Sequence, residues 1–223
     1  MSYILALDAT TEACSVALLA GEQVIEDFQV IPRLHAQRLL PMIEALLAQA
    51  GVSLAQLDAL AYGRGPGAFT GIRIAAGVAQ GLAYAVDRPL YPVSTLAAMA
   101  QGAWRETGKQ AILASLDARM DEVYWSAYRI EQGLAVLQGD EQVLPPENVV
   151  SPSGEWLGWG SGWRYASRFS GAVQPHSHHV EVFPHAQDVT RLAMPLLAAG
   201  VVIRAEEALP VYIRDQVTHK AAG

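Results

Sequence analysis

The sequence is poor in cysteine, in charge and in basic runs. Cys14 is the only cysteine among 223 residues, so no disulfide can form within the chain and a reducing compartment is expected. Charged residues make up only 17% and hydrophobic residues 52%, so much of the chain must be buried, in a core or against a partner. No Lys/Arg run offsets the net charge of −7, which argues against a broad nucleic-acid-binding surface.

Targeting and membrane segments are missing as well. The opening MSYILALDATTEACS has no basic region, and Asp8 interrupts its apolar stretch, which argues against a signal peptide. The longest weakly polar stretch, 74–86, is too short to span a bilayer and contains Gln80. We therefore expect a soluble, cytoplasmic protein without membrane contact.

The first half of the chain is typical of an α/β fold that opens with a β-meander. Its expected elements, in the order βββαβαβα, are strands at 3–9, 14–21 and 23–30, a helix at 35–51, a strand at 57–62, a helix at 70–86, a strand at PLYPVS and a helix at 94–106. The first three strands are joined so tightly that they should pair antiparallel. Pro41 indicates a kink in the first helix or a later start.

The second half repeats this opening at lower fidelity. ILALDATTEACSVALL resembles ILASLDARMDEVYWSAY at 112–128, and the match places Asp8 over Asp117. Beyond it we expect a Pro-rich loop at 139–154, a strand with a glycine turn at 155–163, and a helix at 186–199. The repeat indicates a duplicated fold with halves 1–106 and 107–223, the second of them degenerate.

The stretch GRGPGAFTG at 63–71 could be a phosphate loop or a tight turn. A P-loop needs a lysine, and no lysine occurs between Met1 and Gly108. Gly63, Gly65 and Ala68 match G-x-G-x-x-A, but the acidic residue that should end the next strand is missing there. A turn in which the glycines supply unusual dihedral angles is therefore the better interpretation.

The helix that follows is rich in small residues on more than one face. Ala75, Ala79 and Ala83 form one i, i+4 row, and Gly77, Gly81 and Ala85 form another. Glycine within a helix costs roughly 1 kcal/mol relative to alanine, so the two glycines need a packing reason. One face can pack on the protein's own sheet, and the second favours helix–helix contact with another subunit. The predicted partner interface comprises His35, Arg38, Leu39, Met42, Ile43 and Leu46 of the first helix and Ile72, Ala75, Ala76, Ala79 and Ala83 of the second.

Asp8, which ends the first strand beside Thr10 and Thr11, is a candidate for a nucleotide site. An aspartate with adjacent hydroxyls can hold hydrated magnesium and phosphate oxygens, although a turn aspartate that bonds its local backbone is commoner. Asp117 is followed by Ala-Arg-Met, so the second half lacks the hydroxyl or glycine residues with which a second loop would bind phosphate. We expect at most a vestigial nucleotide site, formed by Asp8, Thr10, Thr11, Gly65 and Gly67, with no catalytic residue, no metal and no cofactor of its own.

The remaining reactive side chains give weaker signals. A cluster of histidines lies near two prolines at 175–185, where a solvated loop is a better interpretation than a metal site: His176, His178, His179 and His185. Cys14 is expected to be a buried strand residue. No G-x-S-x-G motif indicates a serine hydrolase.

The segments ILALDATTEACSVALL, PRLHAQRLLPMIEALL, LDALAYGRGPGAFTGIRIAAGVAQGLAYA, LDARMDEVYWSAY and PVYIRDQVTHK together resemble one family. It is the TsaB (YeaZ) family, bacterial subunits of the machinery that makes threonylcarbamoyladenosine in tRNA. The resemblance covers nearly the whole chain and is poor only around 139–185.

This resemblance implies an actin-like, sugar-kinase-type ATPase fold of two ribonuclease-H-like halves. The family is similar to TsaD, the catalytic subunit, whose metal-binding His-x-x-x-His falls on Thr95 and Met99 here. The resemblance therefore implies a non-catalytic subunit that pairs with a TsaD-like partner through the two N-terminal helices. It also implies a homodimer through a similar surface, help in recruiting a TsaE-like ATPase, and contact with tRNA only through the complex.

Three alternatives remain open at this level. One is a small actin-like kinase or acyltransferase that uses Asp8 and Thr10 on a nucleotide phosphate. Another is a metallopeptidase-like role, against which the missing His-x-x-x-His argues. The last is a homodimer with an unrelated binding role.

Overall fold

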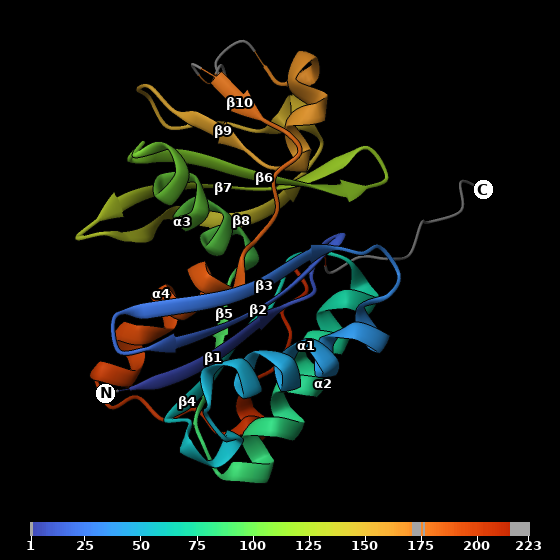
Figure 1. Ribbon diagram of the computed structural model, residues 1–223. Helices are drawn as coiled ribbons and strands as arrows, with labels where there is room; N and C mark the ends of the chain where they lie inside the picture. The colour runs from blue at the N-terminus through green and yellow to red at the C-terminus, as the bar shows by residue number, and fades with distance from the viewer. Residues whose placement is uncertain (1, 171–174, 176, 215–223) are drawn as a thin grey trace.

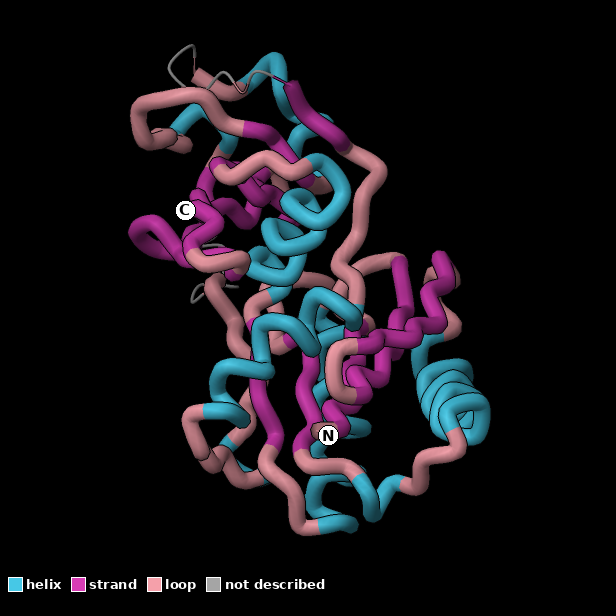
Figure 2. The backbone as a smooth tube through the Cα atoms, turned by 60° about the vertical axis from the view of Figure 1, so that its left-hand side comes forward, coloured by secondary structure: helices cyan, strands magenta, loops and turns pink. Residues whose placement is uncertain are grey.

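The computed structural model describes residues 2–170, 175 and 177–214, which form two lobes, one stacked on the other (Figures 1 and 2). The first lobe is built on a five-stranded sheet in the order β3-β2-β1-β4-β5. Its strands are β1 (Tyr3–Asp8), β2 (Ala13–Ala20), β3 (Gln23–Val30), β4 (Ala59–Gly63) and β5 (Leu90–Val93). The first three pair antiparallel, and β4 and β5 add in parallel. The meander and the order βββαβαβα are confirmed.

Two helices, α1 (His35–Ala50) and α2 (Phe69–Val86), cover one face of this sheet (Figure 1). Leu39, Ile43 and Leu46 of α1 follow the helical period and pack into the core with Leu5 and Leu7 of β1. The helix ends where Gly51 adopts a left-handed conformation (φ 66°). The later start expected from Pro41 is wrong, because α1 already begins at His35 and Pro41 lies inside it.

The second lobe has the same sheet topology. Its strands are β6 (Ala111–Arg119), β7 (Glu122–Glu131), β8 (Leu134–Leu144), β9 (Leu157–Trp159) and β10 (Ser177–His179). Their order, β10-β9-β6-β7-β8, repeats that of the first sheet, with β6, β7 and β8 in the places of β1, β2 and β3. The duplicated, actin-like arrangement of two ribonuclease-H-like halves is therefore confirmed.

The second half is degenerate in its helices. Where the first half has α1 and α2, the described residues between β8 and β10 form two 3₁₀ segments, η2 (Pro146–Asn148) and η3 (Ser161–Arg168). The loop expected over 139–154 is wrong at its start, because β8 continues to Leu144 and pairs with β7 across an irregularity near Trp125. In the sequence LAVLQGDEQVL, apolar and polar residues do not alternate regularly. Neither face of this edge strand is buried along its whole length, so no such alternation is required.

The last helix of each half packs against the sheet of the other half. Helix α3 (Thr95–Thr107) places Leu96, Met99 and Ala103 in a core with β6 and β9 of the second lobe. Helix α4 (Ala186–Ala198) places Val189 and Ala193 against β1, β2 and β4 of the first lobe. The last strand of the first sheet, β5, and the first strand of the second, β6, lie on either side of the expected boundary at 106/107. The backbone itself passes from one lobe to the other at Ser94, before α3, and returns at 180–185, before α4.

Helix α2, with 18 residues, is long and apolar enough to meet the criteria for a membrane span, whereas the stretch 74–86 considered in the sequence is too short. A core helix of a globular protein passes the same test, and this helix turns Ile72, Ala75, Ala79 and Ala83 into the first lobe.

Candidate functional site

The loop after β1 contains a buried aspartate with one unused oxygen. Asp8 is 1% exposed, and its Oδ1 accepts hydrogen bonds from the backbone N–H (2.9 Å) and hydroxyl (2.8 Å) of Thr10. Its Oδ2 has no hydrogen-bond partner in the described part of the chain. Burial raises the pKa of Asp8 to about 7, although the bonds from Thr10 lower it. The raised pKa follows from the absence of a partner for Oδ2, which leaves the buried charge uncompensated.

The glycine turn is packed directly onto this loop. A side chain at Gly63 would collide with the Asp8 carboxylate, and one at Gly67 or Gly71 would collide with the backbone carbonyl of Thr10 or Ala9. The N–H of Ala68, at the start of α2, donates to Thr10 O (2.7 Å). These close contacts between the turn and the loop after β1 support the interpretation of the glycines as a tight turn.

The two hydroxyls near Asp8 are also engaged within the chain. Thr95 Oγ1 donates to Thr10 Oγ1 (3.2 Å), and the Thr95 N–H donates to Gly65 O (3.0 Å). Thr11 Oγ1 accepts from the N–H of Ala13 (3.3 Å). The five residues of the predicted vestigial site are thus brought together, and their contacts hold β1, the glycine turn and α3 in place.

In the second lobe the corresponding aspartate is neutralised by arginines. Asp117 Oδ2 lies 3.3 Å from Arg164 Nη1 and 3.6 Å from Arg119 Nη1, and its Oδ1 accepts the N–H of Arg119. Beyond it, β6 turns into β7 through Met120 and Asp121, both at positive φ, as in a type I′ hairpin. The connection after Asp117 is therefore a tight two-residue hairpin.

Thr95 and Met99 have packing roles on α3. Thr95 is bonded as described, and the Met99 thioether fills the space beside Gly160, where a side chain would come within 2.9 Å of its Cε. Over residues 2–170, 175 and 177–214, no three His, Cys, Asp or Glu side chains lie close enough to hold a metal ion. His178 and His179 lie exposed on β10, and His176 lies outside the described residues.

Most of the predicted interface residues of α1 and α2 are buried in the free chain. Ten of the eleven predicted interface residues are buried in this chain's own first lobe: His35, Leu39, Met42, Ile43, Leu46, Ile72, Ala75, Ala76, Ala79 and Ala83. The small residues of the first row let α2 lie close to the sheet and to α1, and His35 Nε2 bonds Ala13 O of β2 (3.1 Å). Only Arg38 is exposed.

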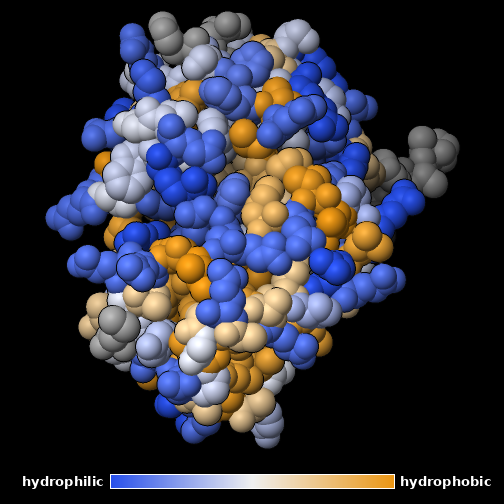
Figure 3. All heavy atoms as spheres, in the orientation of Figure 1, coloured by the Kyte–Doolittle hydropathy of each residue, from blue (hydrophilic) through white to orange (hydrophobic). Residues whose placement is uncertain are grey.

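The opposite row of α2 faces outward over its whole length. We call Phe69, Arg73, Gly77, Gly81, Tyr84 and Ala85 the α2 outer face; all six are exposed, Phe69 by 60% and Tyr84 by 80%. A Cβ added at Gly77 or Gly81 would meet no described atom within 4 Å. Apolar residues gather over this lobe, where α1 and α2 lie, whereas the second lobe is mostly hydrophilic in the same view (Figure 3).

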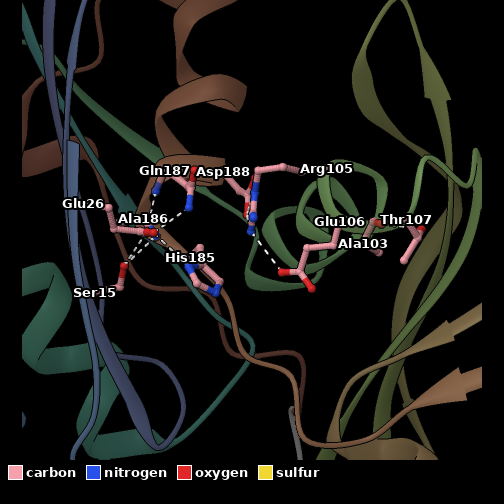
Figure 4. A network of polar contacts seen from close by, with 10 residues as sticks. All are labelled: Ser15, Glu26, Ala103, Arg105, Glu106, Thr107, His185, Ala186, Gln187 and Asp188. Atoms are coloured by element: carbon pink, nitrogen blue, oxygen red, sulfur yellow. Dashed lines mark hydrogen bonds and ion pairs between the residues drawn. The ribbon is translucent and has the colours of Figure 1, made fainter. Parts of the chain in front are cut away.

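Two partly buried glutamates hold the points at which the chain crosses between lobes, and no local sequence pattern indicates either of them. Glu26 of β3 accepts bonds from Ser15 Oγ, Gln187 N, Gln187 Nε2 and His185 Nδ1 at the start of α4 (Figure 4). His185 also stacks on Phe28 (4.1 Å between ring centroids), so the expectation of a solvated loop is wrong for this residue. Burial alone would raise the pKa of Glu26, but the bonds from His185, Gln187 and Ser15 outweigh it and lower that pKa.

The second crossing has a similar arrangement. Glu141 of β8 accepts hydrogen bonds from Ser94, the residue that caps α3, and from the Tyr128 hydroxyl (2.6 Å). Arg64 of the glycine turn lies 3.8 Å from the same carboxylate. Each glutamate therefore comes from the third strand of its sheet and contacts the helix that arrives from the other half.

Comparison with known proteins places the chain in a family. Residues 29–158 match the family model described as "TsaD: tRNA N6-adenosine threonylcarbamoyltransferase". The chain is 46% identical to the tRNA threonylcarbamoyladenosine biosynthesis protein TsaB of Escherichia coli K12, over 97% of this chain and 96% of that protein. It is 39% identical to the Haemophilus influenzae protein of the same name, over 97% and 95%.

Among solved structures, YeaZ from Pseudomonas aeruginosa superimposes with a TM-score of 0.92 at 53% identity, over 95% of this chain and 100% of that one. The likeness thus extends through both lobes, including the segment around 139–185 where the sequence motifs were weakest. The chain therefore belongs to the family that the TsaD model describes and, within it, to the TsaB (YeaZ) branch.

Proposed function

We propose that this chain is a non-catalytic subunit in the formation of threonylcarbamoyladenosine in tRNA. It docks onto a TsaD-like catalytic subunit, supports recruitment of a TsaE-like ATPase and reaches tRNA through that complex in the cytoplasm. The names of its relatives support the pathway. The contacts of Asp8, Thr10, Thr95 and Asp117 support a structural part for the residues that would otherwise carry chemistry.

The observation that carries the docking role is the pair of glycines on the α2 outer face. Gly77 and Gly81 lie mid-helix and cost roughly 1 kcal/mol each relative to alanine. The described chain gives no packing reason for them, because a Cβ at either position would enter open space. A second helix packed against this face would supply the reason, since two backbones can approach closely only where side chains are small.

The residues around the glycines suit such a contact. Phe69 and Tyr84 stand at the two ends of the outer face and expose large aromatic rings, which are enriched where protein interfaces gain most of their affinity. Arg73 lies over the Phe69 ring, with its guanidinium carbon 3.4 Å from the ring centroid. The same face would serve a homodimer, so we propose that the homodimer and the mixed complex exclude each other.

Reconstitution tests the function as a whole. The purified chain is mixed with TsaD-like and TsaE-like subunits, ATP, threonylcarbamoyl-adenylate and unmodified tRNA, and the modified adenosine is quantified with each component omitted in turn. We expect product only when this chain is present and none from this chain alone. Turnover by the chain alone, abolished by Asp8→Ala, would instead establish the actin-like kinase or acyltransferase.

Substitution of Gly81 by leucine tests the docking face. The Leu side chain points into solvent in the free chain but would hold a partner helix away, so association with the TsaD-like subunit should weaken about tenfold or more. Ala198→Leu, on the exposed end of α4, is the matched control and should leave association unchanged. Both variants should fold as the parent does by circular dichroism, and unaltered binding by Gly81→Leu would move the interface elsewhere.

A further inference from the structure

The last described residues return to the glycine turn and reach across to the second lobe. We define the strap as residues 208–214, which follow the 3₁₀ segment η4 (Ala205–Glu207). At its start, the Ala208 carbonyl accepts hydrogen bonds from the Tyr62 hydroxyl (2.8 Å) and from Gln80 Nε2 (3.0 Å). This anchors the strap to β4 and α2 of the first lobe.

The middle of the strap lies on the backbone of the glycine turn. The Val211 N–H donates to Arg64 O (2.9 Å), and a side chain at Gly65 would come within 2.9 Å of Val211 O. Glycine is therefore required at position 65 for two reasons: its φ of 104° suits the turn, and the strap leaves no space for a side chain. One residue on, Tyr212 packs near Phe69, with ring centroids 5.9 Å apart.

The end of the strap contacts the β6–β7 hairpin of the second lobe. The Arg214 guanidinium pairs with the Glu122 carboxylate and donates to Arg119 O (3.4 Å), and Nη1 lies 3.1 Å from the Met120 sulfur. Arg214 is 18% exposed at its side chain, so this contact is partly shielded from solvent. These contacts with a carboxylate, a carbonyl and a thioether fix the Arg214 guanidinium and the hairpin relative to each other.

The hairpin tip needs such support. Arg119, Met120 and Asp121 are three successive non-glycine residues at positive φ (64°, 55° and 60°). Such residues are unfavourable and persist where surrounding contacts hold them. The strap supplies these contacts at Arg119 and Met120, and Arg168 holds Asp121 by an ion pair (2.9 Å).

We propose that the strap is a non-covalent lock that fixes the angle between the two lobes. The chain crosses between the lobes at Ser94 and at 180–185, and beside these crossings Arg105 of α3 pairs with Asp188 of α4 (3.0 Å), so the lobes pivot at this side. Arg214 adds a further tie at the β6–β7 hairpin, away from these crossings, so its loss frees the lobes to open on the side of the glycine turn. This role concerns the free chain and does not depend on the proposed docking function.

Distance measurement between the lobes tests the lock. Spin labels are attached to cysteines introduced at Gln49 of α1 and Ser167 of η3, both exposed; the native Cys14 is fully buried and escapes labelling. Breaking the pair from either lobe, by Arg214→Ala or by Glu122→Gln, should raise the ratio of longer to shorter distances about threefold to fivefold, as expected for one partly exposed ion pair. Arg204→Ala removes an exposed arginine outside the strap and should leave the distances unchanged.

A charge exchange distinguishes the lock from a general loss of folding. The double variant Arg214→Glu with Glu122→Arg should restore the parental distances, because the pair is rebuilt in reverse. Parental distances in both Arg214→Ala and Glu122→Gln would overturn the proposal. So would equal opening in Arg204→Ala.

Discussion

The two lobes share a sheet topology and differ in what they build around it. The first lobe has α1 and α2 between its strands, whereas the second has the 3₁₀ segments η2 and η3 at these places in the described part of the chain. The helices that both lobes keep, α3 and α4, are those that cross to the other half and bury the interior between the sheets. The two lobes are thus alike in the helices that build the core between the sheets, and they differ in the helices on their outer faces.

The same contrast holds for polar groups. Glu26 and Glu141 lie on equivalent strands and each holds the start of a crossing helix, so the two lobes use one device for one structural task. Asp8 and Asp117, by contrast, follow equivalent strands but have opposite surroundings: the first is buried and short of partners, the second is surrounded by arginines. The two halves of this fold are therefore more alike in the residues that join them than in the aspartates that follow their first strands.

The largest effects should come from the close backbone approaches that both lobes share. A methyl group at Gly71 would collide with Ala9 O, and one at Gly160 (φ 116°) would collide with Ser115 O. Gly71→Ala and Gly160→Ala should each lower the free energy of unfolding by about 3 kcal/mol or more, measured by urea denaturation. Gly77→Ala, on the α2 outer face, is the control and should raise it by up to about 1 kcal/mol. Similar stability of all three variants would contradict this account of the turns.

The next largest effect should come from Asp8→Asn, which tests whether the aspartates of the two lobes differ in their effect on stability. Burial raises the pKa of Asp8 to about 7, whereas the unfolded chain titrates near the ordinary 3.8. Between these pH values the folded state binds more protons, so the stability of the parent falls as pH rises and levels off above about 7. Because one pKa unit corresponds to about 1.4 kcal/mol, the asparagine variant should gain roughly 3 kcal/mol on the parent between pH 5 and pH 8.

Denaturant titrations of both proteins at several pH values measure this gain. The asparagine oxygen can still accept both bonds from Thr10, so the loop geometry should be kept. Parallel pH profiles for parent and variant would mean that Asp8 is ionised in the fold. Asp8 would then regain its standing as a cation ligand.

Much of the first lobe could be predicted because its signals are local. The apolar runs of β1 and β2, the glycine after α1 and the period of Leu39, Ile43 and Leu46 are set by neighbouring residues. The family resemblance supplied the topology of the second lobe. The loop expected at 139–154 overlaps the second half of β8, because Gly139 and the following charges hide an edge strand with no steadily buried face.

The candidate site was harder, because burial depends on which side of a helix meets the sheet. Both small-residue rows of α2 are visible in the sequence, but only the structure shows that Ala75, Ala79 and Ala83 face inward and Gly77 and Gly81 outward. The contacts of Glu26 with Gln187 join positions 161 residues apart, and no local pattern reports such a pair. The strap is equally non-local, since Arg214 and Glu122 are 92 residues apart.

Glu26→Gln tests the shared crossing device. The carboxylate accepts four bonds in a partly buried position, so its replacement should lower stability by about 1–3 kcal/mol at pH 7. The folded pKa of Glu26 is lowered, so its contribution is present above the unfolded pKa and is lost as pH falls through the folded one. The difference between variant and parent should therefore shrink in acid, in urea titrations at pH 7 and pH 3.5. A difference that is the same at both pH values would assign the loss to packing rather than charge.

The smallest effect should come from Asp117→Asn, the counterpart of Asp8→Asn in the second lobe. The arginines paired with Asp117 are half or more exposed at their side chains, and such ion pairs are worth no more than about 1 kcal/mol. The asparagine oxygen can still accept the Arg119 N–H, so we expect a loss below about 1 kcal/mol at pH 8 that diminishes further in high salt. The sign is opposite to that for Asp8, where removal of the charge stabilises. If Asp117→Asn also stabilised the chain at pH 8, the two loops would have kept a common electrostatic character, and the divergence between the lobes would lie in their helices alone.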